Sequence, residues 1–315
     1  MSDKSRNWTA ELIPSQGGRR VLITGANSGI GFETALELAR KGAEVILPAR
    51  SLQKAQDAAD RIRKEVPGAQ VTASLLDLAS QESVREFTRW FSERYPGASI
   101  DILINNAGVM AVPKRELTVD GFERQFATNF LGPFALTARL YPYMRQTSGN
   151  RIVVVSSSAT KWARIDFSNL QSERKYSPMS QAYAQSKLAD SIFALELNRR
   201  LSNARSPIVA VSAHPGYAIT NLQTSGPGKE FSPFRLLGMA LKPLLSQDAA
   251  HGALPTLFAA ASSDAKPGAY YGPDGLFELK GFPKEISIPS AARIVGDGSR
   301  LWETAEHLTG IAFRI

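Results

Sequence analysis

The sequence contains no cysteine among its 315 residues. This absence excludes a disulfide framework, a thiolate metal site, a thiol nucleophile and an iron–sulfur cluster. Because it is compatible with a reducing compartment, we expect a cytoplasmic protein. Long apolar runs are also missing, since no stretch approaches the roughly 18 residues that span a membrane. Residues 1–18 are polar and do not resemble a secretory signal, so we expect an N-terminal extension there and no membrane span.

Concentrated charge of one sign is absent as well. The formal net charge is +8, but the basic residues are scattered and are not interleaved with aromatic residues as in nucleic-acid-binding surfaces. We therefore expect a solvated basic surface that attracts small anions and binds no nucleic acid. The histidines His214, His251 and His307 lack the spacing of metal ligands, so no metal site is expected.

The sequence does contain a repeating alternation of short β-branched runs and amphipathic stretches. Such a rhythm predicts a parallel sheet covered by helices, and 43% hydrophobic residues suffice for a large core. The predicted strands are residues 19–24, 43–48, 70–75, 100–105, 151–156 and 207–213, with a last short strand within 269–275. We expect a single α/β domain over residues 19–315, in which residues 217–315 form a substrate lid and a C-terminal extension.

A glycine-rich turn follows the first predicted strand. The sequence TGANSGIG at residues 24–31 leads directly into a helical pattern. Glycines let the backbone approach a pyrophosphate closely, and the amides at the start of the helix then face its negative charge. This order of strand, glycines and helix predicts a dinucleotide site, and a purely structural turn is the alternative.

The second and third predicted strands end in residues that suit the adenosine half of a dinucleotide. A fold that prefers NAD places an acidic residue after the second strand, whereas this sequence has Arg50 and Ser51. A cation and a hydroxyl suit a 2′-phosphate, which predicts NADP(H) in preference to NAD(H); a plain surface arginine is the alternative. Asp77 and Leu78 can hold the adenine edge, and an Asp that caps the helix at 80–95 is the other interpretation.

Three further motifs occur in order along the chain: Asn105-Asn106-Ala107-Gly108 after the fourth strand, Ser157 after the fifth, and Tyr183 with Lys187 on the next helix. With the glycine-rich turn, they make residues 19–220 resemble the short-chain dehydrogenase/reductase family, and in particular its retinol-dehydrogenase-like branch. The resemblance implies a Rossmann-type, doubly wound parallel sheet of strand order 3-2-1-4-5-6-7. It also implies interconversion of a ketone or aldehyde and an alcohol with NADP(H).

The resemblance also implies a role for individual residues. Asn129 would anchor a water next to Lys187. The pyrophosphate would be held by Gly25, Ser28, Ile30 and Gly31, and the adenosine ribose by Asn106 and Ala107. The nicotinamide would face Pro215, Gly216, Ala218 and Thr220. Lys187 would bind the nicotinamide ribose.

The chemistry of the Tyr-Lys pair follows from its spacing. Residues at i and i+4 of a helix share a face, so the Lys187 ammonium can reach the Tyr183 hydroxyl. A free phenol has a pKa of about 10, and lowering it by about three units requires roughly 4 kcal/mol of preferential stabilisation of the phenolate, which a fixed ammonium and a cationic nicotinamide can supply together. Tyr183 would then donate a proton to the carbonyl oxygen, and Ser157 would hydrogen-bond that oxygen; Ser156 is the second choice.

The substrate side is less defined by sequence. The long excursion before Tyr183 contains apolar residues that form either a substrate wall or ordinary packing: Trp162, Ile165, Phe167 and Leu170. The apolar stretch at 234–245 suits a pocket for a bulky lipophilic carbonyl compound, or else a cover for the sheet edge or a subunit contact. Relatives commonly pair through the helices that carry Asn129 and Tyr183, so a homodimer or homotetramer is possible. The rival functions are a non-catalytic nucleotide-binding sensor or scaffold, and a carbon–carbon double-bond reductase.

Overall fold

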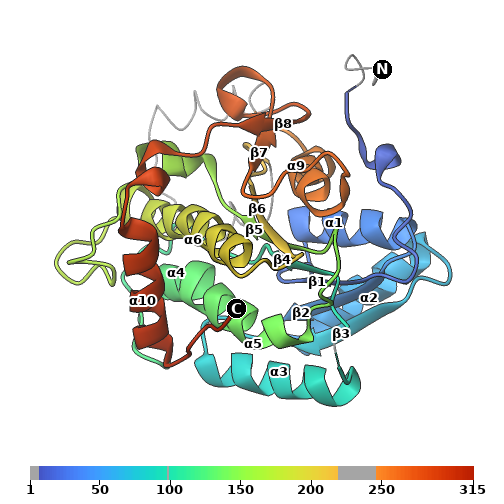
Figure 1. Ribbon diagram of the computed structural model, residues 1–315, viewed down its shortest axis with the longest axis horizontal. Coiled ribbons are helices and arrows are strands. Elements are labelled where there is room, and N and C mark those ends of the chain that lie inside the picture. Colours follow the sequence, from blue (N-terminus) through green and yellow to red (C-terminus); the bar gives the residue numbers. More distant parts are fainter. Residues whose placement is uncertain (1–6, 98, 219–245) are drawn as a thin grey trace.

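The computed structural model describes residues 7–97, 99–218 and 246–315. It contains an eight-stranded sheet of order β3-β2-β1-β4-β5-β6-β7-β8 (Figure 1). The strands are β1 (Arg20–Ile23), β2 (Glu44–Ala49), β3 (Val71–Leu75), β4 (Ile102–Asn105), β5 (Arg151–Val155), β6 (Val209–Ala213), β7 (Tyr270–Pro273) and β8 (Pro283–Ile286). Strands β1 to β7 pair in parallel, which confirms the predicted order, and β8 adds an antiparallel edge that was not predicted.

Helices cover both faces of this sheet (Figure 1). One face carries α1 (Gly29–Arg40), α2 (Leu52–Glu65) and α9 (Ala249–Ala261); the other carries α3 (Gln81–Arg94), α5 (Gly132–Leu140) and α6 (Ala184–Asn203), with α10 (Asp297–Thr309) outside them. Strand side chains alternate between the two layers: Leu22 of β1 joins the core on the α6 side, whereas Val21 and Ile23 join the core on the α1 side. Both faces are buried, as expected of a parallel sheet.

Short helical segments complete the chain. Two of them are π-helical turns that continue into α-helices: η2 (Ala127–Leu131) joins α4 (Arg124–Phe126) to α5, and η5 (Pro178–Tyr183) leads into α6. The remainder are short 3₁₀ turns, η1 (Ala10–Leu12), η3 (Tyr141–Tyr143), η4 (Ser158–Trp162), η6 (Leu276–Glu278) and η7 (Ser290–Arg293). π-Helical turns are rare and often lie at functional sites, and these two carry Asn129 and Tyr183.

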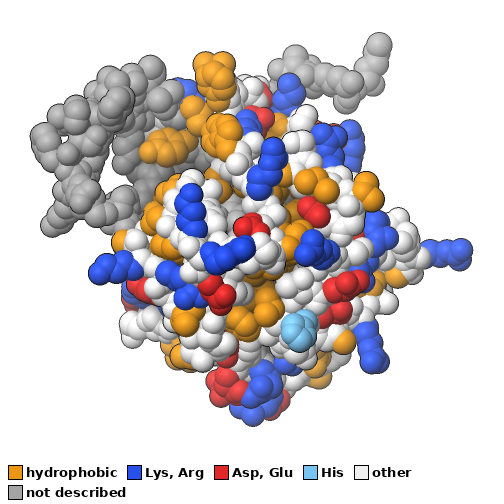
Figure 2. Space-filling view, turned by 90° about the vertical axis from the view of Figure 1, so that its left-hand side faces the viewer, with side chains coloured by type: hydrophobic (Ala, Val, Ile, Leu, Met, Phe, Trp, Pro, Cys, Tyr) orange, Lys and Arg blue, Asp and Glu red, His pale blue; other side chains and the backbone are white. Residues whose placement is uncertain are grey.

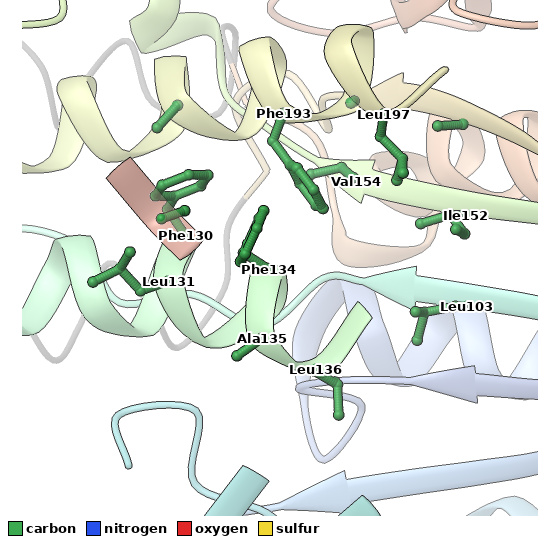
Figure 3. Packing of buried hydrophobic residues seen from close by; sticks show 14 of the residues in the cluster. Leu103, Phe130, Leu131, Phe134, Ala135, Leu136, Ile152, Val154, Phe193 and Leu197 are labelled. Carbon is green, nitrogen blue, oxygen red and sulfur yellow. The ribbon is translucent and has the colours of Figure 1, made fainter. Parts of the chain in front are cut away.

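An aromatic cluster fixes η2 and α5 against α6. The rings of Phe130, Phe134 and Phe193 point toward one another between these helices (Figure 3). Their centroids are 6.2 Å apart for Phe130 and Phe193 and 5.5 Å apart for Phe134 and Phe193. Edge-on and tilted ring pairs at such distances stabilise packing beyond the area they bury. The cluster therefore fixes the η2 turn, which bears Asn129, beside the start of α6.

The two ends of the domain pack against its core. Before the first strand, Trp8 contacts Phe258 of α9 with ring centroids 5.2 Å apart, and Ile13 is buried. At the other end, the rings of Trp302 in α10 and Phe134 have centroids 5.2 Å apart. Residues 246–315 thus extend the sheet and the core, and most of the predicted lid, including 234–245, falls outside the described residues. Of the helices that are described, none has the length and apolar character needed to cross a membrane.

Candidate active site

The loops after β1 and β4 are tied together at the carboxyl edge of the sheet. The Thr24 hydroxyl accepts hydrogen bonds from the amides of Asn106 and Ala107, both at 3.1 Å. The Asn106 side chain donates in return to the Thr24 carbonyl oxygen at 2.9 Å. Parallel strands bring their carboxyl ends to one edge, where ligands of doubly wound sheets bind. The two predicted cofactor segments therefore form one continuous surface.

Two glycines of the cradle allow this close contact. Gly25 has a φ of 68°, and a Cβ placed on it would lie 2.8 Å from the Cα of Ala107. A Cβ on Gly31 would lie 2.4 Å from Asn106 Nδ2 and 2.5 Å from the Gly25 carbonyl oxygen. Any larger residue at either position would push the two loops apart, so both glycines are required by the backbone itself.

The start of α1 suits a phosphate group. The Ser28 side chain makes no capping hydrogen bond, so it leaves the amides of the first turn for a ligand, which the helix dipole makes attractive to an anion. Ile30 lies on the same turn and is half-buried. It packs near Gly252 of α9, because a Cβ on Gly252 would lie 3.4 Å from Ile30 Cγ1. The residues present therefore fit a pyrophosphate.

Arg50 and Ser51 lie at the carboxyl end of β2. Arg50 is exposed, and within the described ranges it forms no ion pair. Ser51 is the N-cap of α2, where its hydroxyl accepts from the Lys54 amide at 3.4 Å. Arg50 thus remains a cation that an anionic ligand can reach, while the Ser51 hydroxyl also has a structural role.

Asp77 and Leu78 follow β3. The Asp77 carboxylate accepts from the Ala79 amide at 2.9 Å, but the N-cap of α3 is Ser80, whose Oγ accepts from the Ser83 amide. The alternative that Asp77 caps this helix is therefore wrong. Leu78 is buried, and its carbonyl oxygen lies against Gly132, where a Cβ would approach to 2.2 Å.

Lys187 is almost completely buried, and its ammonium group is bound by two oxygen atoms. It donates to the Val155 carbonyl at 2.9 Å and to Asp190 Oδ2 at 2.8 Å. Burial lowers the pKa of Lys187, but Asp190 and Tyr183 more than offset this effect, so the pKa lies above its usual value. Lys187 is therefore protonated at neutral pH, and the charge interaction with Tyr183 agrees with the predicted proximity of the pair.

Asn129 connects the loop after β4 to α6. Its Oδ1 accepts from the Val109 amide at 2.7 Å, and its Nδ2 donates to the Val109 carbonyl at 3.0 Å and to Ser186 Oγ at 2.8 Å. A Cβ on Gly108 would lie 3.2 Å from Asn129 Oδ1 and 3.5 Å from Lys187 Nζ, so these two side chains are near neighbours. Both Nδ2 hydrogens of Asn129 are therefore used by protein atoms. A water bound by Asn129 would donate to its Oδ1, which keeps one lone pair, or to its backbone carbonyl.

The two serines after β5 have different environments. Ser156 is buried, and its Oγ hydrogen-bonds with the Lys187 carbonyl and with Ser191 Oγ, both at 2.8 Å. Ser157 is half-buried and accepts from the Ala159 amide at 3.2 Å. Of these two serines, Ser157 alone keeps a hydroxyl hydrogen that no described residue accepts, which favours it over Ser156 as the carbonyl-binding residue.

The predicted nicotinamide turn is held between two other segments. Gly216 has a φ of 65°, and a Cβ on it would lie 2.4 Å from the Leu279 carbonyl oxygen. Gln247 Nε2 donates to the Pro215 carbonyl at 2.8 Å, and the backbone of Ala218 pairs with that of Gln247. Thr220, the last predicted contact, lies outside the described residues.

His214 connects this turn to the loop between β7 and β8. Its Nδ1 accepts from the Gly216 amide at 3.1 Å, and its Nε2 lies 3.1 Å from Glu278 Oε2. Glu278 also pairs with Lys161 of η4 at 3.0 Å. Burial lowers the pKa of His214, so the ring is neutral at neutral pH and donates its Nε2 hydrogen to Glu278. Sequence analysis did not predict the contact with Glu278, which is distant from His214 in sequence.

The excursion before Tyr183 is mainly packed into the domain. Leu170 is buried, and Ile165 and Phe167 are partly buried against the core on the α6 side. Trp162 differs, because 82% of its surface is exposed. The burial of Leu170, Ile165 and Phe167 is what the packing interpretation predicts. No group of three His, Asp or Glu side chains in the described parts of the chain could hold a metal ion.

Asp190 is a second residue that sequence analysis missed. It lies three residues after Lys187 and seven after Tyr183, so helical periodicity alone puts all three on one face. Burial raises the pKa of Asp190 to about 7, against the lowering effect of the adjacent Lys187 ammonium. An acidic residue three positions after Lys187 was the sequence feature that could have predicted this contact.

Comparisons with known proteins agree with this site. The sequence profile described as short chain dehydrogenase matches residues 19–229. Mouse retinol dehydrogenase 13 is 39% identical over 299 residues, covering 94% of this chain and 85% of that protein. The crystal structure of an uncharacterized protein from Mycobacterium paratuberculosis has a TM-score of 0.80 at 40% identity, covering 98% of this chain and 100% of that chain. The angucycline C-6 ketoreductase LanV with bound NADP has a TM-score of 0.62 at 27% identity, covering 82% and 94%.

The chain therefore belongs to the short-chain dehydrogenase family. Like other members, it is an oxidoreductase that acts on CH–OH and C=O groups with a nicotinamide cofactor. Within the family it falls in the retinol-dehydrogenase-like branch, as the resemblance implied.

Proposed function

We propose that this protein interconverts a bulky, lipophilic ketone or aldehyde and the corresponding alcohol, with NADP(H) as the preferred cofactor. The observation that carries the proposal is the buried Lys187, whose charge interacts with Tyr183 and whose ammonium donates to the Val155 carbonyl, two residues before Ser157. A proton donor, a fixed cation and a hydrogen-bond donor are the groups that a carbonyl reduction requires. A carbon–carbon double-bond reductase has less need of this set.

In the proposed reduction, the bound nicotinamide cofactor supplies the hydride. Ser157 donates a hydrogen bond to the carbonyl oxygen, where negative charge develops, and Tyr183 transfers its hydroxyl proton to the same oxygen. The Lys187 ammonium stabilises the resulting phenolate through its positive charge. In the oxidation of the alcohol, the same residues act in reverse order.

The preference for NADP(H) rests on Arg50. This exposed cation follows β2, at the position where NAD-preferring folds carry an acidic residue. LanV, which binds NADP, supports the proposal by similarity. Retinol is itself a lipophilic alcohol, and the name of mouse retinol dehydrogenase 13 supports the same substrate class here. A cytoplasmic location remains a proposal based on the cysteine-free sequence.

A substrate screen tests the function. Aldehydes and ketones of increasing size and hydrophobicity are added to the enzyme with NADPH or NADH, and cofactor oxidation is followed by absorbance. The proposal predicts turnover that rises with hydrophobic size and is faster with NADPH. Binding of NADPH without turnover of any carbonyl compound would favour a nucleotide-binding sensor or scaffold instead.

A single variant tests the cofactor preference. Arg50→Glu removes the cation and introduces a charge that repels the 2′-phosphate and can accept from a ribose hydroxyl. We expect the ratio of the kcat/KM values for NADPH and NADH to fall by about 10-fold or more, since one lost charge-assisted hydrogen bond is worth about 1.5–3 kcal/mol. Arg205→Glu, at another exposed arginine, is the control. An unchanged ratio in Arg50→Glu contradicts the proposed role of Arg50.

A further inference from the structure

We propose that Asp190 is a positioning residue for Lys187: it fixes the direction of the ammonium group, and its negative charge sets the pH range in which Tyr183 exchanges its proton. The inference rests on the proposed function of Tyr183 and Lys187. It adds Asp190 to this pair, about one turn beyond Lys187 along α6.

The geometry gives Asp190 direct control of the ammonium group. An ammonium has three N–H donors. In Lys187 one is directed to the Val155 carbonyl and a second to Asp190 Oδ2, at 2.9 and 2.8 Å. The Lys187 and Asp190 side chains are almost fully buried, with 6% and 2% of their surfaces exposed. One N–H remains for Tyr183 or a cofactor ribose, and its direction is fixed by the other two.

Asp190 is not arranged as a structural carboxylate would be. Its second oxygen, Oδ1, is buried and has no hydrogen-bond partner among the described residues, and an unsatisfied buried acceptor is destabilising. Glu123 offers the contrast within the same chain, because it is also buried and its two oxygens accept from the amides of Gln125 and Phe126. A carboxylate that destabilises the fold on one side and binds Lys187 on the other indicates a functional role.

Among the residues that the structure describes, the other groups around the ammonium are uncharged. The loop after β4 contributes Gly108, η2 contributes the Asn129 amide, and β5 contributes the Val155 carbonyl. The titratable groups that influence Lys187 are Asp190 and Tyr183 of its own helical segment. Asp190 is therefore the negative charge against which the Lys187 charge is balanced, and its ionisation determines how strongly the ammonium favours the phenolate.

The sign of the effect follows from electrostatics. A nearby anion disfavours the loss of a proton from every neighbouring group. Burial raises the pKa of Asp190 to about 7, so the carboxylate is ionised above neutral pH. Removing its charge should make both Tyr183 and Lys187 release their protons at lower pH. The whole pH dependence of the reaction then moves in the acidic direction.

Asp190→Asn tests the proposal, because it preserves the shape and an acceptor oxygen while removing the charge. We expect the acid limb of kcat/KM for alcohol oxidation to move to lower pH by about one unit. In the cofactor-free protein, the ultraviolet absorbance of tyrosinate is titrated with and without the additional change Tyr183→Phe. The difference between the two titration curves is the contribution of Tyr183. The midpoint of this difference curve should also move to lower pH in Asp190→Asn. Asp190→Ser, a second neutral variant, should move the acid limb and the Tyr183 midpoint in the same direction.

Glu123→Gln is the matched control, because it neutralises a buried carboxylate that is not among the groups that influence Lys187. We expect it to leave both pH dependences unchanged. If the Asp190 variants also leave both unchanged, and lose only thermal stability as a structural carboxylate would, Asp190 has no positioning role. Failure of the proposed function would give a different result: the single variant Tyr183→Phe would then keep full turnover.

Discussion

Among individual residues, the adjacent Ser156 and Ser157 have different roles: Ser156 is structural, and Ser157 is the proposed carbonyl-binding residue. Ser156 uses its hydroxyl to bind the backbone of Lys187 and the side chain of Ser191 inside the core. Ser157 faces the opposite way and caps the short η4 turn as an acceptor. Because successive residues leaving a strand point to opposite sides, the pleat of β5 itself decides which serine can meet a substrate.

The two serines therefore predict opposite effects when each is replaced by alanine. Ser157→Ala removes a hydrogen bond to the developing charge and should lower kcat/KM by about 10²–10³-fold with little change in stability. Ser156→Ala removes buried hydrogen bonds and should lower the free energy of unfolding by about 1–3 kcal/mol. Steady-state kinetics and urea unfolding measure the two effects. Loss of turnover in Ser156→Ala, with turnover retained in Ser157→Ala, would reverse the assignment.

At the level of elements, the loop between β7 and β8 is held against the predicted nicotinamide turn. Phe277 and Glu278 both have left-handed φ values, 54° and 59°, which are unfavourable for residues with a side chain. The contacts of Glu278 with His214 and Lys161 hold this strained segment in place. Strain that persists beside a ligand-binding turn is a common feature of functional loops.

His214 predicts a specific pH dependence of stability. Its pKa is lowered by burial, so the unfolded chain takes up a proton at a higher pH than the folded one does. As the pH falls below about 6.5, this residue should therefore destabilise the fold, by at most about 1.4 kcal/mol per pH unit. Urea unfolding of the wild type and of His214→Asn, at about pH 7.5 and at about pH 5.5, measures the difference.

The variant should lose less stability on acidification than the wild type does. Asn can replace His214 as the acceptor for the Gly216 amide, so the fold should be retained. His251→Asn, at an exposed histidine, is the control and should behave like the wild type. Equal losses in the wild type and in His214→Asn would contradict the neutral, buried histidine.

The sequence predicts some elements better than others, for physical reasons. Strands such as β1, β2, β4 and β5 are almost entirely buried on both faces and read as apolar runs, so they were identified. Strand β8 was not, because Lys284 and Glu285 are exposed at an edge and carry no apolar alternation. The π turns at Asn129 and Tyr183 depend on how neighbouring helices pack, and a helical pattern alone does not encode them.

In the whole molecule, the site is assembled from segments that are far apart in sequence. Its order could be predicted because a parallel sheet brings the ends of β1, β4 and β5 to one edge. The pairing of His214 with Glu278 could not, since it depends on the path of the chain after β7. On the face shown in Figure 2, basic side chains are dispersed among acidic and hydrophobic ones, as the sequence suggested.

The outer helix α10 bears on the predicted oligomer. It packs across α6, with Trp302 against Phe134 and Phe193. A homodimer or homotetramer that pairs through the helices carrying Asn129 and Tyr183 would have to use the surface that α10 leaves uncovered. Pairing through these helices remains a prediction, and this arrangement restricts how it can occur.

Tyr183→Phe tests the central claim most directly, because it removes the proposed proton donor and little else. NADPH oxidation with the best carbonyl substrate from the screen is compared between the wild type and this variant, and NADPH affinity is measured by fluorescence titration. The account predicts that kcat falls by about 10²–10⁴-fold, the usual contribution of general acid catalysis, while the Kd for NADPH stays within a few-fold of the wild-type value. Full turnover in Tyr183→Phe would contradict it.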